Sequence, residues 1–202
     1  LGPDNCPMKG DFPTPEELFG DREDLLATAR NAAIIEGEGY RKWTRSKEII
    51  ELARRLGVSR VGLAACKGMK LELDIYAGWL AAAGFEVLRG PDAAGNDRCG
   101  PREQAALFNS SGTGLNVVMG MCVGHDSLFM QASRALVTPL IAQDSFLRHN
   151  PVAALHTHST YFQGPLYHAH KQAYAAPVLE PGTLQEAAKD PFGPAADRLE
   201  EL

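Results

Sequence analysis

Short apolar runs and helical patterns alternate between residues 60 and 142, and this alternation limits the possible folds more than any other feature. Apolar runs predict four strands, at residues 60–65, 85–88, 115–119 and 136–142. Apolar residues at helical spacing predict helices between them, over 69–83, 101–109 and 125–132. Strands joined by helices make right-handed crossovers, so the four strands should form one parallel sheet.

The sheet should be covered on both faces, because the runs at residues 61–65 and 115–119 are apolar on both faces, with Asn116 as the one polar residue in them. If the strand order is the flavodoxin-like 2-1-3-4, the first and third strands are neighbours. The switch point, where such sheets bind their ligands, then lies between these two strands. We therefore expect an α/β fold, a single domain with a four-stranded parallel, Rossmann-like sheet.

Segments of different character flank this pattern. Residues 1–20 are rich in proline and glycine and predict an irregular arm. The domain is expected over residues 21–155 and opens with two helices, at 22–40 and 46–56, the second ended by Gly57. In residues 156–202 periodicity fades and proline recurs, so we expect an extended tail that packs on its own domain or on a partner subunit. The second arrangement would make a homodimer.

Charge and hydrophobicity exclude some function classes. The net charge is -5 and lysine and arginine form no run, which argues against nucleic acid as a partner. No apolar stretch approaches 18 residues, and the first residues lack a signal pattern, so no membrane segment is expected. Four widely separated cysteines fit no secreted disulfide framework. These features predict reduced thiols and a cytoplasmic protein.

Three cysteines follow predicted strands or precede a predicted helix. Cys66 comes directly after the first strand, and Cys122 comes shortly after the third. Cys99 stands two residues before Pro101, and Pro101 suits the first turn of a helix. The unpaired amides at the start of such a helix favour a thiolate at Cys99. Because all three belong to one edge of the sheet, we expect Cys66, Cys99 and Cys122 to hold a metal or cluster. The simpler alternative is that each is a small apolar core residue.

The spacing of these cysteines bears on the kind of metal. Structural zinc sites normally contain a close Cys-x-x-Cys pair, which is absent here. Ligands donated singly from three loops suit a [4Fe-4S] cluster with one iron left to a different ligand, such as His125, Cys6 or an exogenous molecule. An iron open to substrate would act as a Lewis acid. Zinc bound by these cysteines with Cys6 or His125 is the alternative.

His125 and Asp126 follow Cys122 by one helical turn. They allow a metal-free alternative, in which Cys122 is a nucleophile, His125 its base and Asp126 the residue that orients the imidazole. In the simplest interpretation, Asp126 or Ser127 only caps the helix that begins there. His125 and Lys67, beside two of the cysteines, are expected to border the open side of the site.

Residues 36–45 are dense in polar and aromatic groups for a link between two helices, and Gly37 and Gly39 allow a break of the first helix there. Tyr40, Lys42 and Arg45 are candidate walls of a substrate pocket, where the cations would hold an anionic substrate or balance the charge of a cluster. Alternatively, Tyr40 and Trp43 are core residues and the cations are solvated. The pairs His156/His158 and His168/His170 have metal-like spacing, but their place in the tail favours surface residues.

Several strings resemble the bacterial family called domain of unknown function 1847, whose members are described as metal-binding proteins. The strings are Asn5-Cys6-Pro7, residues 38–45, Cys66-x-Gly68, residues 120–129 and residues 149–155. The resemblance covers residues 5 to about 155. It implies that Cys66, Cys99 and Cys122 share one site. Family members carry further cysteines ahead of Asn-Cys-Pro, which this chain lacks, so an N-terminal metal site around Cys6 is in doubt.

These observations favour a metal-binding protein that holds an iron-sulfur cluster. It would be either an enzyme that acts on a small molecule or a redox protein that acts with a redox partner. A zinc protein is the first alternative. A metal-free hydrolase or small-molecule sensor that uses Cys122 is the second.

Overall fold

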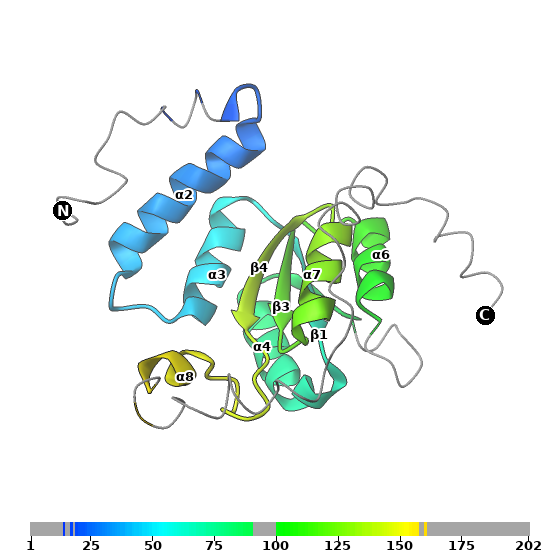
Figure 1. Cartoon of the computed structure of the whole chain (residues 1–202). Coiled ribbons are helices and arrows are strands. Elements are labelled where there is room, and N and C mark those ends of the chain that lie inside the picture. The colour runs from blue at the N-terminus through cyan, green and yellow to red at the C-terminus, as the bar shows by residue number, and fades with distance from the viewer. Residues whose placement is uncertain (1–13, 15–16, 18, 91–99, 158–159, 161–202) are drawn as a thin grey trace, which may run out of the picture. The chain divides into compact units, whose positions relative to one another are not determined.

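A computed structural model describes residues 14, 17, 19–90, 100–157 and 160 of the chain. Its centre is a four-stranded sheet of β1 (Arg60–Ala65), β2 (Glu86–Arg89), β3 (Leu115–Met119) and β4 (Leu136–Ile141). The order is β2-β1-β3-β4 and every pairing is parallel (Figure 1). The predicted fold class and the predicted strand order are therefore both confirmed.

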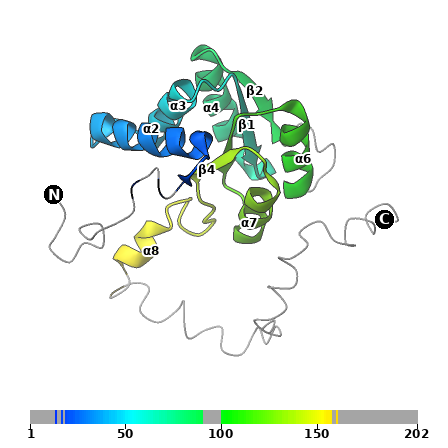
Figure 2. The ribbon, with the colours of Figure 1, turned by 90° about the horizontal axis from the view of Figure 1, so that it is seen from above.

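Alternate residues of each strand point to opposite faces of the sheet. Both faces are therefore apolar, and helices cover each of them. One face packs on α3 (Arg45–Arg55) and α4 (Lys70–Ala82), with Leu63 and Val117 in the core between them. The other face packs on α6 (Pro101–Ser111) and α7 (Val123–Ala132) through Ala64 and Val118. Figure 2 shows these two layers on either side of the strands.

The N-terminal helical segment is also confirmed. α2 (Glu23–Gly39) packs on α3, and the two helices are joined by a short turn. α2 runs through Gly37 and ends only at Gly39, where an added Cβ would lie 2.7 Å from the Trp43 ring. Residue 39 has to be glycine because the Trp43 ring lies so close to it. The helix is not broken at Gly37. Gly57, after α3, has the predicted left-handed conformation, with a φ of 68°.

The chain divides into two units, Leu1–Ala153 and Ala154–Leu202. The short helix α8 (Val152–His156) crosses this division. The predicted arm at residues 1–20 and tail at 156–202 lie almost entirely outside the described residues, so the predictions on their packing stay untested. Within the described part of the chain, no helix combines the length and the apolar character needed to cross a membrane.

Candidate functional site

Cys66 and Cys122 occupy equivalent positions at the carboxyl ends of two neighbouring strands. Cys66 follows β1 and is the N-cap residue of the 3-10 turn η2 (Lys67–Met69) that leads into α4, with φ -71° and ψ 147°. Cys122 is the N-cap residue of α7, with φ -69° and ψ 158°. The last paired residues of the two strands, Ala65 and Met119, are in register. Cys66 is partly buried and Cys122 is exposed.

The two cysteine-bearing turns pack against each other through Met69 and Gly120. Met69 closes the turn after β1, donating its backbone N–H to the Cys66 carbonyl at 2.9 Å, and its side chain is buried. Gly120 follows β3 with a φ of 62°, and an added Cβ there would lie 2.5 Å from Met69 Cγ. The Gly120 N–H also bonds the Ile141 carbonyl at the end of β4. These contacts join the ends of β1, β3 and β4.

Gln104 ties the start of α6 to the end of β1, one residue before Cys66. Its side-chain Oε1 accepts the Ala65 N–H and its Nε2 donates to the Ala65 carbonyl, both at 3.1 Å. β2 pairs with β1 only as far as Leu63, so the amide takes the place of the next residue of that strand. Gly90, just after β2, leaves the space that the amide fills.

Cys99, the third predicted ligand, lies outside the described residues. The residue after it, Gly100, is the N-cap of α6 with a φ of 43°, and Pro101 is in the first turn as predicted. Gln104 therefore holds the turn that follows Cys99 beside the turn that carries Cys66. Among the residues that the structure describes, no three His, Cys, Asp or Glu side chains form a metal-binding group. Cys6, His158, His168 and His170 are likewise outside that set.

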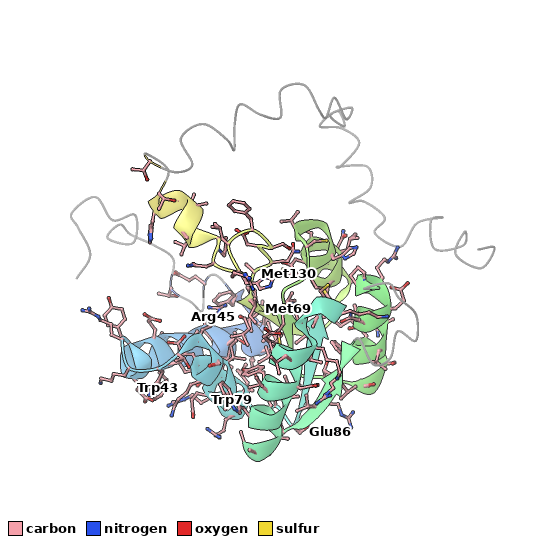
Figure 3. The ribbon with its side chains drawn as sticks, turned by 90° about the horizontal axis from the view of Figure 1, so that it is seen from below. Trp43, Arg45, Met69, Trp79, Glu86 and Met130 are labelled. Carbon is pink, nitrogen blue, oxygen red and sulfur yellow. The ribbon has the colours of Figure 1, made fainter. Side chains whose placement is uncertain are left out.

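In the part of the chain that the structure describes, four helices begin at this edge of the sheet. α4 and α7 follow the ends of β1 and β3, and the start of α6 is bonded to the end of β1. The start of α3 is fixed there by Arg45, which donates from Nε to the Pro139 carbonyl at 2.6 Å and from Nη2 to Thr138 Oγ1 at 2.9 Å, both in β4. Figure 3 views the molecule from this side and labels Met69 and Arg45 in its central part. The positive ends of four helix dipoles favour a negatively charged group here.

His125 and Asp126 lie in the first turn of α7, and neither Asp126 nor Ser127 caps the helix. The helix begins at Val123 because the Cys122 carbonyl already accepts the Asp126 N–H at 2.9 Å. Asp126 Oδ1 is buried and has no hydrogen-bond partner among the described residues. Burial raises the pKa of the Asp126 carboxyl above its ordinary value, and the charge of His125 opposes this shift. The site thus contains a carboxyl group that retains its proton more readily than usual.

Asp126→Asn is expected to change how stability depends on pH. The folded chain binds the Asp126 proton more tightly than the unfolded chain, so protonation of Asp126 stabilises the fold. This stabilisation is fully present below the ordinary pKa of 3.8 and is lost as the pH rises through the raised pKa of the folded state. Asparagine cannot titrate, so the variant does not lose this stabilisation. Its free energy of unfolding, measured by urea titration, should therefore rise relative to that of wild type as the pH increases from about 3 to about 7.

Asp74→Asn is the matched control of opposite sign. The Lys70 ammonium, hydrogen-bonded to Asp74, lowers the pKa of that carboxyl, so the variant should lose stability relative to wild type over the same pH range. A constant difference between Asp126→Asn and wild type at all pH values would show that Asp126 titrates normally.

The other predicted site residues are spread over two places. Lys67 is exposed at the first position of η2, directly after Cys66. Tyr40 and Lys42 are exposed in the turn between α2 and α3, and Tyr40 is therefore not a core residue. Tyr40 is the C-cap residue of α2, where the helix ends with a φ of -49° and a ψ of 119°. Arg45, the first residue of α3, is the one of these residues whose described hydrogen bonds reach the sheet, at Thr138 and Pro139 of β4.

The loop after β4 contains a histidine, His149, for which the sequence pattern indicates no role. Asp144 N–H donates to His149 Nδ1 at 3.2 Å, and His149 N–H donates to the Asp144 carbonyl at 2.8 Å. Arg148 and His149 both have left-handed backbones, with φ values of 53° and 64°. Because β4 ends at Ile141, this loop leaves the sheet at the same edge as the cysteines.

The sequence matches the family described as "Protein of unknown function (DUF1847)" over residues 14–90 and 91–140. It is also 35% identical over 153 residues to an uncharacterised protein of Methanocaldococcus jannaschii. That alignment covers 67% of this chain and 79% of the relative. The relative is archaeal, so the family resemblance is not confined to bacteria. Neither description mentions a metal, and metal binding stays a prediction.

Proposed function

Since the chain belongs to the DUF1847 family of proteins of unknown function, its function has to be inferred from the site, and we propose that Cys66, Cys99 and Cys122 hold a metal centre. The observation that carries the proposal is the equivalent placement of Cys66 and Cys122 as N-cap residues after the neighbouring strands β1 and β3. The contact between Met69 and Gly120 keeps the two turns together.

The donor set fits an iron-sulfur cluster better than zinc. Three thiolates from three separate loops suit a [4Fe-4S] cluster, whereas a structural zinc site would normally contain a close pair of cysteines. The four helix starts at this edge would offset the negative charge of cluster and thiolates. Partial exposure of the site leaves it open to a small molecule or a redox partner. Reduced thiols of this kind fit a cytoplasmic protein.

A bound cluster of this type would supply electron transfer or a Lewis-acidic iron. The protein residues around it have separate roles in this proposal. Lys67 and His125, each within a helical turn of a cysteine ligand, would exchange protons with the substrate, and Asp126 would hold a proton beside His125. Arg45, fixed on β4, would attract an anionic substrate. Tyr40 and Lys42 are candidates for an outer wall.

One observation favours a second candidate, thiolate chemistry without a metal. Cys122 is exposed at the start of a ten-residue helix, where the helix dipole promotes the thiolate, and His125 follows one turn later. In that case Cys122 alone should react rapidly with iodoacetamide, and Cys66→Ser and Cys99→Ser should leave its rate unchanged. Under the metal proposal, loss of any one ligand exposes the other two to alkylation.

Serine variants of the full chain, purified without oxygen, test the proposal. Cys66→Ser, Cys99→Ser and Cys122→Ser should each lose most of the bound metal, because a cluster with three protein ligands tolerates the loss of none. Cys6→Ser is the matched control and should retain the metal as wild type does. Equal metal content in all four variants would contradict the proposed centre. If Cys6→Ser and Cys122→Ser lost the metal while Cys66→Ser and Cys99→Ser retained it, the ligands would be a different set.

A further inference from the structure

The outward side of α4 is apolar, although the opposite side of the same helix already packs on the sheet. The inward side chains are buried: Leu73, Tyr76, Ala77 and Leu80. Leu71, Ile75 and Trp79 lie one helical turn apart and are 67%, 46% and 54% exposed; Figure 3 labels Trp79. A helix that is apolar on two opposite sides is typical of a helix buried between two layers. The outward side of α4 is therefore suited to a second layer.

Small residues complete this surface, and their order makes it self-complementary. Gly78 and Ala82 continue the line of Leu71 and Ile75 along the helix. An added Cβ at Gly78 would have no atom within 4 Å, so the surface is open there. Large side chains thus occupy its first half and small residues its second half. Against a reversed copy of the helix, Leu71 would face Ala82 and the next pair would match in the same way, as a twofold interface requires. The α4 outer face consists of these residues: Leu71, Ile75, Gly78, Trp79 and Ala82.

Charged residues beside the α4 outer face are also arranged for a reversed copy. The Tyr76 hydroxyl donates to the Ser46 carbonyl at 3.0 Å, so α3 lies along the Tyr76 side of α4. Both helices run opposite to the strands, because α3 leads into β1 and α4 follows it. Glu72 is exposed one turn before Tyr76. On α3, Arg54 is exposed two turns after Ser46, and it bonds Glu51 through Nη1 at 2.6 Å while half of its side chain stays exposed. An acid and a base therefore lie toward opposite ends of this surface.

We propose that the α4 outer face is the interface of a homodimer, in which two α4 helices pack antiparallel about a twofold axis between Ile75 and Gly78. Such an axis keeps the α3 side of one copy beside the α3 side of the other. Glu72 of each copy then lies near Arg54 of the other, and the antiparallel helix dipoles attract. Three large side chains make a small interface, so the dimer is weak, with a dissociation constant between micromolar and millimolar. The dimer does not depend on the metal centre.

Ile75→Lys should disrupt the dimer, because it places a cation in the apolar contact beside the twofold axis. In sedimentation velocity of the full chain, wild type should pass from monomer to dimer between micromolar and millimolar concentration, and the dissociation constant of the variant should be at least tenfold higher. Ile34→Lys on α2 is the matched control, since Ile34 and Ile75 are 44% and 46% exposed. It should dimerise as wild type does. At concentrations where wild type is monomeric, both variants should keep the wild-type urea midpoint.

An exchange of charges tests the antiparallel orientation. Glu72→Arg and Arg54→Glu should each weaken the dimer, because each brings like charges together across the twofold axis, and the double variant should recover the wild-type dissociation constant. A double variant that binds no more tightly than the single variants would overturn the proposed arrangement.

Two further results would overturn the homodimer. One is a wild-type chain that stays monomeric at millimolar concentration; if Ile75→Lys then lowered the urea midpoint, another segment of the same chain would cover the α4 outer face. The other is an equal effect of Ile75→Lys and Ile34→Lys on the dissociation constant, which would place the contact between copies elsewhere.

Discussion

Gln104→Leu is expected to lower the free energy of unfolding by about 3 kcal/mol, because two buried backbone groups of Ala65 lose their partners and each such loss costs roughly 1–3 kcal/mol. Leucine matches the volume and the helix propensity of glutamine, so the loss of hydrogen bonds dominates the effect. The start of α6 would no longer be bonded to β1, so metal retention should fall as well. Urea denaturation and metal analysis of the same preparations measure both effects.

Gln131→Leu is the matched control, since it makes the same chemical change at an exposed position of a helix. Its stability should stay within about 0.5 kcal/mol of wild type. If Gln104→Leu proved as stable as Gln131→Leu, Gln104 would not complete the end of β1 and the proposed link between α6 and Cys66 would be wrong.

Gly120→Ala should cost about 2–3 kcal/mol of stability, for two separable reasons. Alanine is disfavoured at a φ of 62°, and its Cβ would lie 2.5 Å from Cγ of the buried Met69. The change would push apart the turns that carry Cys66 and Cys122. Thermal or urea unfolding gives the stability loss, and metal content reports whether the two turns have separated.

A Met69→Ala background distinguishes the two causes. There the contact is absent, and the additional cost of Gly120→Ala should fall to about 1 kcal/mol, the backbone contribution alone. Gly78→Ala, in the middle of α4 with no atom within 4 Å of the added Cβ, is the control and should raise stability by up to about 1 kcal/mol. Equal costs of Gly120→Ala in both backgrounds would mean that Met69 and Gly120 do not constrain each other.

The fold was predictable because its signals are local and repeated. The runs at 61–65 and 115–119 lack the polar alternation of half-exposed strands, and only a parallel sheet covered on both faces buries them completely. The start of α7 was placed two residues late. Its N-cap, Cys122, makes no side-chain capping bond, so the chain carries none of the usual Ser, Thr, Asp or Asn signals at that position.

The candidate site was only partly predictable. The junction positions of Cys66 and Cys122 followed from the strand pattern, but Gln104 bonds a residue 39 positions away. A signal for it exists, since Gln104 falls on the apolar face that Pro101, Ala105 and Phe108 define in α6, where an amide needs buried partners. The contact between Asp144 and His149 has no such signal, because it depends on left-handed backbones at two residues that are not glycine.

Metal and sulfide content of anaerobically purified full-length protein tests the proposed three-cysteine centre most directly. The proposal predicts a brown protein that contains about four iron atoms and four acid-labile sulfides per chain, as a [4Fe-4S] cluster requires, with little zinc. About one zinc per chain and no sulfide would replace the cluster with the zinc alternative. A colourless protein without stoichiometric iron or zinc would contradict the metal centre itself.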